Sequence, residues 1–566
     1  MAAESDRLGD LARQAITNGT EDAALPLLAA HCAREPDDVF VAHWQALLLR
    51  ALDRREAALP MLKAAAARAP GDASLAQSLA QVALEAGLPA VSLFLAAIRL
   101  APTRPELRLG LAAARLGEGD GERGLDELGT MLAANAGWYD GHRQYAQLAA
   151  LLGAGDAAMA SYERAIAAFP AAGQLYFDAA ALLTEGERYA RALEFADRGM
   201  AAVGEDALLL QLRAGALDEL GQEREAVALF DRLGLIDDVS HTIRRQRHLL
   251  RRGQAARAVA ELEPWFAAGS MEGLWSYAAL AWRMAGDARW EWLERDAFIA
   301  TAEPGPAEID LAALATLLRR LHGRSGRYLD QSVRQGTQTD GNLLWRIEPE
   351  IVALREALRR AIGAYRDALP PLDPGHPMLA RAPQGRIRFT GSWSVRLGDA
   401  GFHEYHIHPH GWVSSAIYIA VPQALGESEG RLLLGGSPTD LGLGLAPIRE
   451  IAPAPVSVGF PPSNGSAGRT GRKELLTMTI SLILALLIAA DAPVQASETP
   501  VAAESAPALS VAEKPVCRRV AEIGSHIRAK RVCMSRQQWD EQREQNRQMI
   551  DRAQMRRSGC GGGGGC

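Results

Sequence analysis

Four of the chain's twelve histidines lie within eight residues, in the stretch "GFHEYHIHPHGWVSS" that runs from residue 401 to residue 415. The side chains of an extended strand alternate between two faces. We therefore expect Glu404, His406 and His408 to point to one face and His403 to point to the other. Imidazole nitrogen is a common ligand of transition metals. Two imidazoles at positions i and i+2 of one strand face can therefore bind a single metal ion.

The histidine cluster allows several interpretations. Histidines can gather on a surface without binding anything, and His410 is as compatible with solvent or a supporting hydrogen bond as with a metal. A zinc hydrolase is a weaker alternative, because no general-base motif such as H-E-x-x-H accompanies the cluster. Paired ligands on one strand with a further histidine on a later strand fit non-haem iron, which leaves coordination positions for a co-substrate and oxygen.

The residues around the cluster predict a β-rich domain. Four segments are separated by glycine and proline and read as short strands: "GRIRFTGSWSVRLG", "FHEYHIHP", "VSSAIYIAVP" and "GRLLLGG". Such strands indicate a sandwich or a barrel. A helix is expected before them in "IEPEIVALREALRRAIGAYRDAL", where Ile351, Leu354, Leu358 and Ile362 recur at helical spacing.

The first half of the chain is repetitive, with a period of about 34 residues. Prolines mark the period: Pro36, Pro70, Pro102 and Pro170. Small residues recur at two fixed positions of each unit, as Ala146 and Ala158 do in one of them. The units resemble the tetratricopeptide repeat, as in "RREAALPMLKAAAARAPGDA", and predict antiparallel helix pairs stacked into a curved solenoid. We expect its groove to bind a protein or peptide, and its scattered histidines to be non-catalytic.

Five motifs in order resemble a known family over about residues 325–462: "QGTQT", "HPML", "GSWSVRL", "GFHEYHIHPHGWVSSAIYIAVP" and "GRLLLG". They are similar to the 2-oxoglutarate and Fe(II)-dependent oxygenases that often follow tetratricopeptide arrays in bacterial proteins. The resemblance implies a mostly-β double-stranded β-helix (jelly roll) that holds Fe(II) and uses 2-oxoglutarate as co-substrate. It implies His406 as the first ligand and His408 where the family usually has Asp or Glu, with Glu404 as the carboxylate alternative.

The end of this domain departs from the family pattern. The family continues from F-P-S to a histidine and then an arginine, but no histidine occurs between His410 and His526. Arg469 and Arg472 lie in a Gly-rich stretch unlike a strand. We therefore expect a truncated oxygenase with impaired catalysis and assign no catalytic residue. The competing hypothesis is a non-enzymatic interaction protein whose oxygenase domain is degenerate.

The last hundred residues look unrelated to what precedes them. Met478 opens an apolar run at 480–490 that ends in an A-x-A-like cleavage site and reads as a secretory signal. We therefore expect residues 478–566 to be a separately exported protein joined by a frameshift or fusion, with a possible disulfide between Cys517 and Cys533. An internal membrane anchor at 480–490 is the alternative. Residues 1–477 are expected to be cytoplasmic.

Length and composition are consistent with several domains. The 566 residues are 48% hydrophobic and carry a net charge of −7, which disfavours both a nucleic-acid binder and a disordered chain. The predicted fold class is multidomain. It comprises an all-α solenoid at 1–298, an incomplete β-helix domain at 307–465, and an appended segment with a disordered or helical tail at 466–566.

Overall fold

The computed structural model describes residues 2–269, 271, 273–302, 309–323, 329, 332–380, 386–406, 412–422, 426 and 429–454. It also describes the strands at 458–460, 467–470, 475–483, 516–521 and 529–534. The N-terminal part is a helical solenoid and the C-terminal part is built on an antiparallel sheet. The first two parts of the predicted fold class, a helical solenoid followed by a β-rich domain, are therefore present. In the third part, 466–566, predicted as a disordered or helical tail, the described residues form strands.

Antiparallel helix pairs make up the solenoid, as the repeat predicts. The helices, in chain order, are α1 (Ala2–Asn18), α2 (Glu21–Arg34), α3 (Val39–Ala51), α4 (Arg55–Arg68), α5 (Ala73–Glu85), α6 (Val91–Leu100), α7 (Pro105–Gly117), α8 (Gly121–Ala134), α9 (Tyr139–Leu151), α10 (Ala160–Ala168), α11 (Gly173–Glu185), α12 (Tyr189–Val203), α13 (Ala207–Glu219), α14 (Glu223–Leu233), α15 (Val239–Arg251), α16 (Ala255–Ala267), α17 (Trp275–Ala285) and α18 (Arg289–Leu293).

Local sequence signals set the ends of these helices. α2, α4, α6 and α10 each end two residues before one of the periodic prolines, because a proline cannot continue the backbone hydrogen bonding and disfavours helix in the residue before it. Several starts are capped by aspartate: the carboxylate of Asp38 accepts from Val41 N at 3.0 Å at the start of α3. Ala146 and Ala158 are fully buried, so the small-residue pattern marks the helix contacts.

The turn between the two helices of each pair has a residue with positive φ at the same position, and these residues are 32 to 34 positions apart. Most are glycine: Gly19, Gly87, Gly119, Gly153, Gly221, Gly253 and Gly286. Asp53 and Glu187, each at φ 58°, take the same position in the α3–α4 and α11–α12 turns. A side chain in the left-handed region costs roughly 1–2 kcal/mol relative to glycine. Two turns therefore carry a strain that the others avoid.

The C-terminal domain contains a nine-stranded antiparallel sheet in the order β1-β7-β4-β9-β3-β8-β5-β6, with β2 paired to β3. Its strands are β1 (Ala300–Ala302), β2 (Val333–Gln338), β3 (Arg388–His406), β4 (Val413–Ala420), β5 (Leu432–Leu434), β6 (Arg449–Ile451), β7 (Val458–Phe460), β8 (Ala467–Thr470) and β9 (Leu475–Ile483). The long β3 pairs with β9 through its first half and with β8 through its last residues. β3 therefore joins two groups of strands, β7-β4-β9 and β8-β5-β6.

Two helices cover this sheet, α19 (Leu311–Leu321) and α20 (Pro349–Asp367). The apolar residues that predicted α20 are all buried: Ile351, Leu354, Leu358 and Ile362. They form one core with Phe389 of β3 and Val413 and Ile417 of β4. The predicted strands before and after the histidine cluster are confirmed as β3, β4 and β5.

The sheet continues past residue 465, where the sequence predicted its end. β8 and β9 follow that point, and β9 lies between β3 and β4, with Thr479 opposite both Trp393 and Ala416. Residues 478–483, the beginning of the predicted secretory signal, therefore belong to a central strand. The remainder of the apolar run at 480–490 lies outside the described residues.

A separate hairpin of β10 (Val516–Ala521) and β11 (Ala529–Met534) places Cys517 and Cys533 directly opposite each other. Facing residues of an antiparallel pair have Cα atoms about 4.5–5.5 Å apart, which is within the range that a disulfide spans. The disulfide stays a prediction. Among the helices that the structure describes, none is both long enough and apolar enough to span a membrane.

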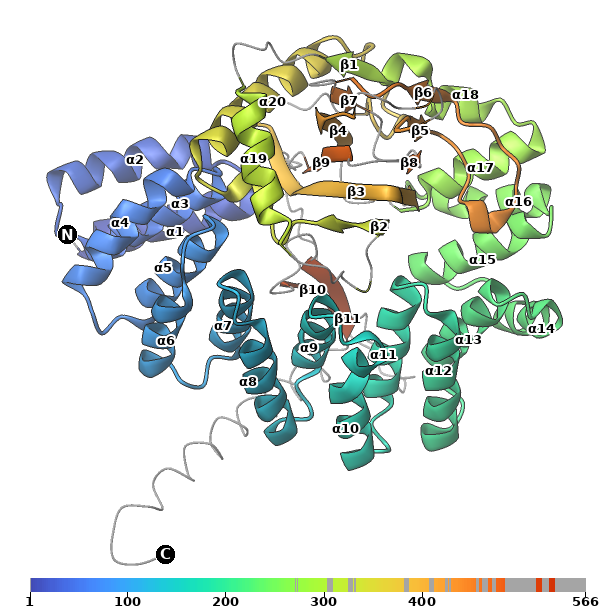
Figure 1. The fold of residues 1–566 in the computed structure, drawn as a ribbon, viewed down its shortest axis with the longest axis horizontal. Coiled ribbons are helices and arrows are strands. Elements are labelled where there is room, and N and C mark those ends of the chain that lie inside the picture. The colour runs from blue at the N-terminus through green and yellow to red at the C-terminus, as the bar shows by residue number, and fades with distance from the viewer. Residues whose placement is uncertain are drawn as a thin grey trace, which may run out of the picture.

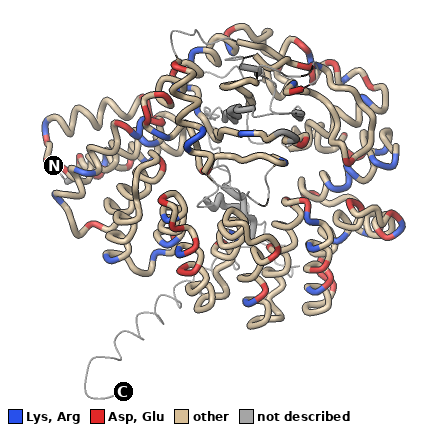
Figure 2. The backbone as a smooth tube through the Cα atoms, in the orientation of Figure 1, with Lys and Arg blue, Asp and Glu red and all other residues tan. Residues whose placement is uncertain are grey.

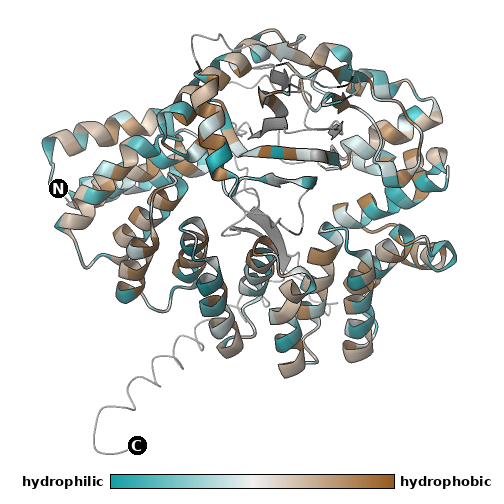
Figure 3. Cartoon of the chain, viewed as in Figure 1, coloured by the Kyte–Doolittle hydropathy of each residue, from teal (hydrophilic) through white to brown (hydrophobic). Residues whose placement is uncertain are grey.

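The solenoid bends around the sheet domain (Figure 1), with α1–α4 on one side of the sheet and α15–α18 on the other. Arg388 of β3 donates to Glu21 at the start of α2 at 2.9 Å. At the opposite end of the arc, Trp292 of α18 donates to Asp373 at 2.9 Å. Acidic and basic residues are interspersed along the helices (Figure 2). Hydrophobic and hydrophilic positions alternate along them as well (Figure 3).

Candidate functional site

The last residues of β3 carry the candidate ligands Glu404 and His406, together with His403. β3 has a register shift here, because His403 lies opposite Arg469 of β8 whereas His406 lies opposite Ala467. Three steps along β3 thus match two steps along β8, which is a β-bulge. The bulge overrides the simple alternation of side chains. The rings of His403 and His406 stack with centroids 5.6 Å apart and planes inclined by 27°, so the prediction that His403 points away from His406 is wrong.

Hydrogen bonds orient both imidazoles. His406 Nδ1 lies 2.8 Å from the backbone oxygen of Glu404. Because a carbonyl can only accept, Nδ1 must carry the proton, and Nε2 is then the nitrogen that can bind a metal. Metal-binding histidines are commonly oriented in this way. His403 Nδ1 lies 3.3 Å from the hydroxyl of Ser332, which immediately precedes β2.

The carboxylate of Glu404 points toward an ion-pair network at the solenoid. Its Oε1 lies 4.0 Å from Arg334 Nε of β2, and Arg334 also donates to the carboxylate of Glu187 in the α11–α12 turn. Burial raises the pKa of Glu404, the nearby Arg334 opposes this rise, and the negative charges of Glu187 and Asp440 add to it. Glu404 is therefore linked to the solenoid through Arg334.

The remaining predicted residues are only partly placed. His408 and His410 lie outside the described residues. Within the part of the chain that the structure describes, no three His, Cys, Asp or Glu side chains come together in a way that could hold a metal. His403 and His406 are thus brought together, whereas the assembly of His406, His408 and Glu404 stays a prediction.

Arg469 is placed differently from what the sequence indicated. It lies on β8, between His403 of β3 and Leu432 of β5, and not in an irregular stretch. The glycines around it mislead a propensity argument, because glycine is rare inside strands. No signal in the sequence shows that β8 pairs with the end of β3. Arg472 lies outside the described residues.

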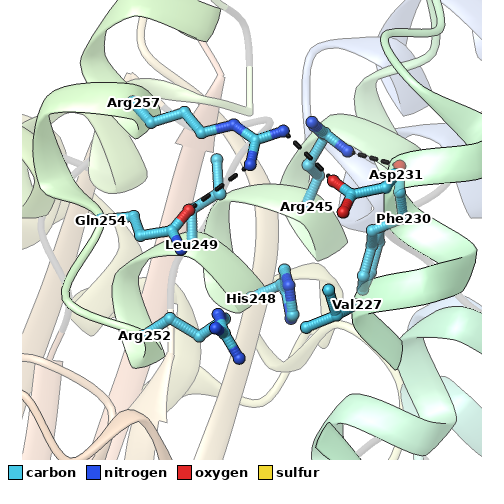
Figure 4. A pocket seen from close by; sticks show the side chains of 9 residues that line it. All are labelled: Val227, Phe230, Asp231, Arg245, His248, Leu249, Arg252, Gln254 and Arg257. Carbon is cyan, nitrogen blue, oxygen red and sulfur yellow. Dashed lines mark hydrogen bonds and ion pairs between the residues drawn. The ribbon is translucent and has the colours of Figure 1, made fainter. Parts of the chain in front are cut away.

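The solenoid contains a cavity of about 250 Å³ between α14, α15 and α16, lined by polar and charged side chains. Its cations already have partners (Figure 4): Arg245 donates to the backbone oxygen of Phe230 at 2.7 Å, and Arg257 lies 3.4 Å from Asp231. His248, also at its wall, is hydrogen-bonded to Asp218 at 2.6 Å. These contacts fasten neighbouring helices together, so the cavity is a gap in the packing of the repeats.

The scattered histidines of the solenoid are hydrogen-bonded one by one. Each has a nearby acceptor or donor: His31 with Asp38, His43 with Ser78, His142 with the backbone of Ala136, His241 with the backbone of Gly234, and His248 with Asp218. Each partner holds one imidazole within its own repeat or against the next one. These contacts give each histidine a role in the packing of the repeats, and its lack of a catalytic role stays a prediction.

Comparison with known protein families gives a match to the segment that contains the histidine-bearing end of β3. Residues 391–437 match the family described as "Putative 2OG-Fe(II) oxygenase". The match covers most of β3, the whole of β4 and β5, and therefore His403, Glu404, His406 and His408. No curated protein matches the chain.

Solved structures similar to this chain include tetratricopeptide repeat proteins and a hydroxylase. A tetratricopeptide repeat protein from Parabacteroides merdae is 16% identical, with 40% of this chain and 91% of that chain covered and a TM-score of 0.28. YrrB, a tetratricopeptide repeat protein with an unusual peptide-binding site, is 18% identical over 32% of this chain and 95% of its own, with a TM-score of 0.23. A prolyl-4-hydroxylase from Pseudomonas putida is 15% identical, with 33% of this chain and 91% of that chain covered and a TM-score of 0.23.

Proposed function

We propose that this chain is an Fe(II)/2-oxoglutarate-dependent oxygenase whose catalytic domain is carried by a tetratricopeptide array. One observation carries the proposal: the segment that matches the oxygenase family contains the strand end on which His403 and His406 stack. The hydrogen bond from Nδ1 to Glu404 O leaves Nε2 of His406 as the nitrogen that can bind a metal. The ligand assignments depend on this observation.

The strand order supports a double-stranded β-helix. In such a jelly roll, strands from the beginning and the end of the domain alternate in two sheets, each antiparallel to its neighbours. Here the order β7-β4-β9-β3 and the order β3-β8-β5-β6 follow this rule, with the long β3 contributing to both. On this interpretation β8 and β9 are the closing strands of the oxygenase domain.

The residues fit an iron site in part. We propose His406 as one ligand, and His408, Glu404 and the newly placed His403 as candidates for the others. Bound Fe(II) with 2-oxoglutarate would supply the oxidative decarboxylation to succinate that drives oxidation of a second substrate. Arg469, opposite His403 in the sheet, is the candidate to pair with the far carboxylate of 2-oxoglutarate, since guanidinium binds carboxylate as a bidentate fork.

We further propose that catalysis is weak. The stretch 411–525 contains no histidine, so β8 and β9 offer no imidazole as a further ligand. The 566-residue protein, purified anaerobically with Fe(II), should convert 2-oxoglutarate to succinate only slightly above background. A version with a histidine restored after Phe460 should do so readily. Brisk turnover by the unaltered chain would show that Glu404 or another residue completes the iron site.

Metal titration tests the ligand assignment directly. His406→Ala should remove most Mn(II) or Fe(II) binding measured by calorimetry. His403→Ala and His408→Ala then identify the second ligand, because only the loss of a ligand should approach the effect of His406→Ala. A His406→Ala variant that binds metal as tightly as the unaltered protein would disprove the proposed site.

A second candidate function, binding of a protein or peptide by the solenoid, is compatible with the first. The observation that favours it is the repeat architecture, whose stacked helices expose an extended surface of the kind that repeat proteins use for partners. The full chain should then still bind a partner selected from a peptide library when His406 is replaced. Loss of every such partner in the His406→Ala variant would contradict a separate binding role.

A further inference from the structure

Backbone strain in this molecule is concentrated where the solenoid meets the sheet domain. In the part of the chain that the structure describes, Asp53, Glu187 and Gln335 are the non-glycine residues with positive φ. Asp53 and Glu187 occupy the turn position that the other helix pairs give to glycine. Such strain persists only where the surroundings hold it, and it clusters at functional positions.

Both acidic turn residues pair with an arginine of the sheet domain. Asp53 Oδ2 accepts from Arg359 of α20 at 3.2 Å, and Glu187 accepts from Arg334 of β2. A glycine at either turn would relieve the strain but would have no carboxylate to offer. The two exceptions to the glycine pattern are therefore also two points at which the domains touch.

The third strained residue, Gln335, directly follows Arg334. Its carbonyl oxygen faces β3 so closely that a Cβ on Gly401 would lie 2.6 Å from it, and one on Gly398 would lie 3.1 Å from it. Two glycines of β3 thus make room for the bulge of β2 at this point. At this bulge the guanidinium of Arg334 donates to Glu187 and also lies 4.0 Å from Glu404 Oε1.

We infer that the two acidic turns are docking points for the sheet domain, and that Glu187, through Arg334, positions the histidine-bearing end of β3. This inference rests on the proposed function for its metal readout but not for its docking readout. Glu187 and Arg334 are positioning residues, and the solenoid becomes part of the support of the metal site.

A short chain of contacts connects Glu187 to the histidines. Arg334 lies opposite Phe402 in the β2–β3 pairing, one residue before His403. On the same stretch, Glu404 N donates to Ser332 O at 3.1 Å and the Ser332 hydroxyl lies 3.3 Å from His403 Nδ1. Fixing Arg334 therefore fixes the strand that holds the end of β3, and with it the placement of the imidazoles.

Asp53 provides a matched control within the same molecule. Its partner Arg359 lies on α20, where its guanidinium stands 5.6 Å from the ring of Phe389, near the beginning of β3 and not at its histidine-bearing end. Replacing either acidic residue by glycine relieves turn strain and removes one ion pair between the domains. Asp53→Gly also removes a 3.4 Å contact with Arg55 inside the solenoid. Only the replacement at residue 187 should change the placement of His403 and His406.

The experiment compares Glu187→Gly with Asp53→Gly in the full chain, by hydrogen exchange at residues 402–404 and by Mn(II) titration. Glu187→Gly should speed exchange at these amides and weaken Mn(II) binding about tenfold, as loss of support around a metal ligand does. Asp53→Gly should change neither the exchange rates of these amides nor the Mn(II) affinity by more than about twofold. Glu187→Asp, which keeps the charge in a residue type that tolerates left-handed backbone, should retain most of the affinity.

Equal effects of the two glycine variants, or no effect of Glu187→Gly on exchange, would overturn the inference. Because glycine suits both turns, neither variant threatens the fold of the solenoid. If the unaltered protein binds no Mn(II), the proposed iron site fails, whereas faster exchange confined to Glu187→Gly still supports the positioning role.

Discussion

The solenoid and the sheet domain differ in how far apart along the chain their contacts lie. Helix pairs of the solenoid pack mainly on the pairs before and after them, so the contacts within the array join residues about one repeat apart. In the sheet domain, β3 pairs with β9 so that Trp393 lies opposite Thr479. Damage in the solenoid should therefore remain local, whereas the loss of one strand should affect the whole sheet. The following predictions test and refine this contrast.

The largest effect is expected from truncating the chain after residue 474, which removes β9 from between β3 and β4. The amides of β3 and β4 should then lose their protection from hydrogen exchange, while the helices of the solenoid keep theirs. A chain that stops after residue 484 retains β9, so its sheet amides and its solenoid helices should both stay protected from exchange. Equal protection in the two truncated chains would mean that β9 is not a structural strand.

A large but local loss is expected from Glu85→Gln in the solenoid. Burial alone would raise the pKa of Glu85, but Arg50 and Arg55 lower it far below its usual range. Arg55 is itself buried and its guanidinium lies 4.1 Å from the ring centroid of Trp345 in the sheet domain. Leaving these cations without Glu85 should reduce the free energy of unfolding by about 3 kcal/mol.

Urea denaturation measures this effect, and Asp37→Asn is the control. The pair between Asp37 and Arg68 is on the surface, with Asp37 92% exposed, so its loss should hardly be detectable. An equal change in the two variants would contradict the role assigned to the buried cluster.

Overpacking at the small-residue positions should cost less. Ala158 is fully buried between the helices of its pair, so Ala158→Leu should force them apart and cost about 2 kcal/mol. The neighbouring Ala157 is exposed, and Ala157→Leu should leave the melting temperature nearly unchanged. If the two variants melt together, the assignment of Ala158 to the helix contact is wrong.

The smallest effect is expected between the two regions, at Glu294 after α18. Burial raises the pKa of this carboxyl to about 7, with Arg283 opposing the rise, and its Oε2 has no hydrogen-bond partner among the described residues. The folded state therefore holds a proton that the unfolded state loses near pH 4.5, so this group reduces stability as pH rises from about 4.5 to about 7.

Glu294→Gln should remove this pH dependence. The full pKa shift corresponds to roughly 3 kcal/mol at pH 8, but Glu294 is only partly buried, so solvent screening should leave a stabilisation of about 1 kcal/mol. At pH 4 the two proteins should be equally stable. Thermal melts at the two pH values measure the difference, and a gain that is equal at both would point to a cause other than ionisation.

The helices and the first strands could be predicted because their signals are local. The prolines after α2, α4, α6 and α10 stop those helices whatever the rest of the chain does, and Ile351, Leu354, Leu358 and Ile362 mark α20 by their spacing alone. The same holds for β4, where residues 416–420 form a short apolar run within a strand that is buried from residue 413 to residue 419.

The site could be predicted only in part, because its geometry depends on distant pairing. The bulge that stacks His403 on His406 arises where β3 meets β8, more than sixty residues later in the chain. The apolar segment 475–483 is equally suited to a signal and to a buried strand, and only its place between β3 and β4 decides between them. Local sequence contains neither piece of information.

Repeat arrays usually gain and lose units in evolution, since each unit depends only on its neighbours. This array is held by the sheet domain at both of its ends, through Glu21 and Arg388 near the first helices and through Trp292 and Asp373 near the last. Duplicating or deleting one helix pair would displace one end relative to the other by a whole repeat and break one set of contacts. Chains that share this arrangement should therefore diverge freely in sequence while inheriting a constant number of repeats.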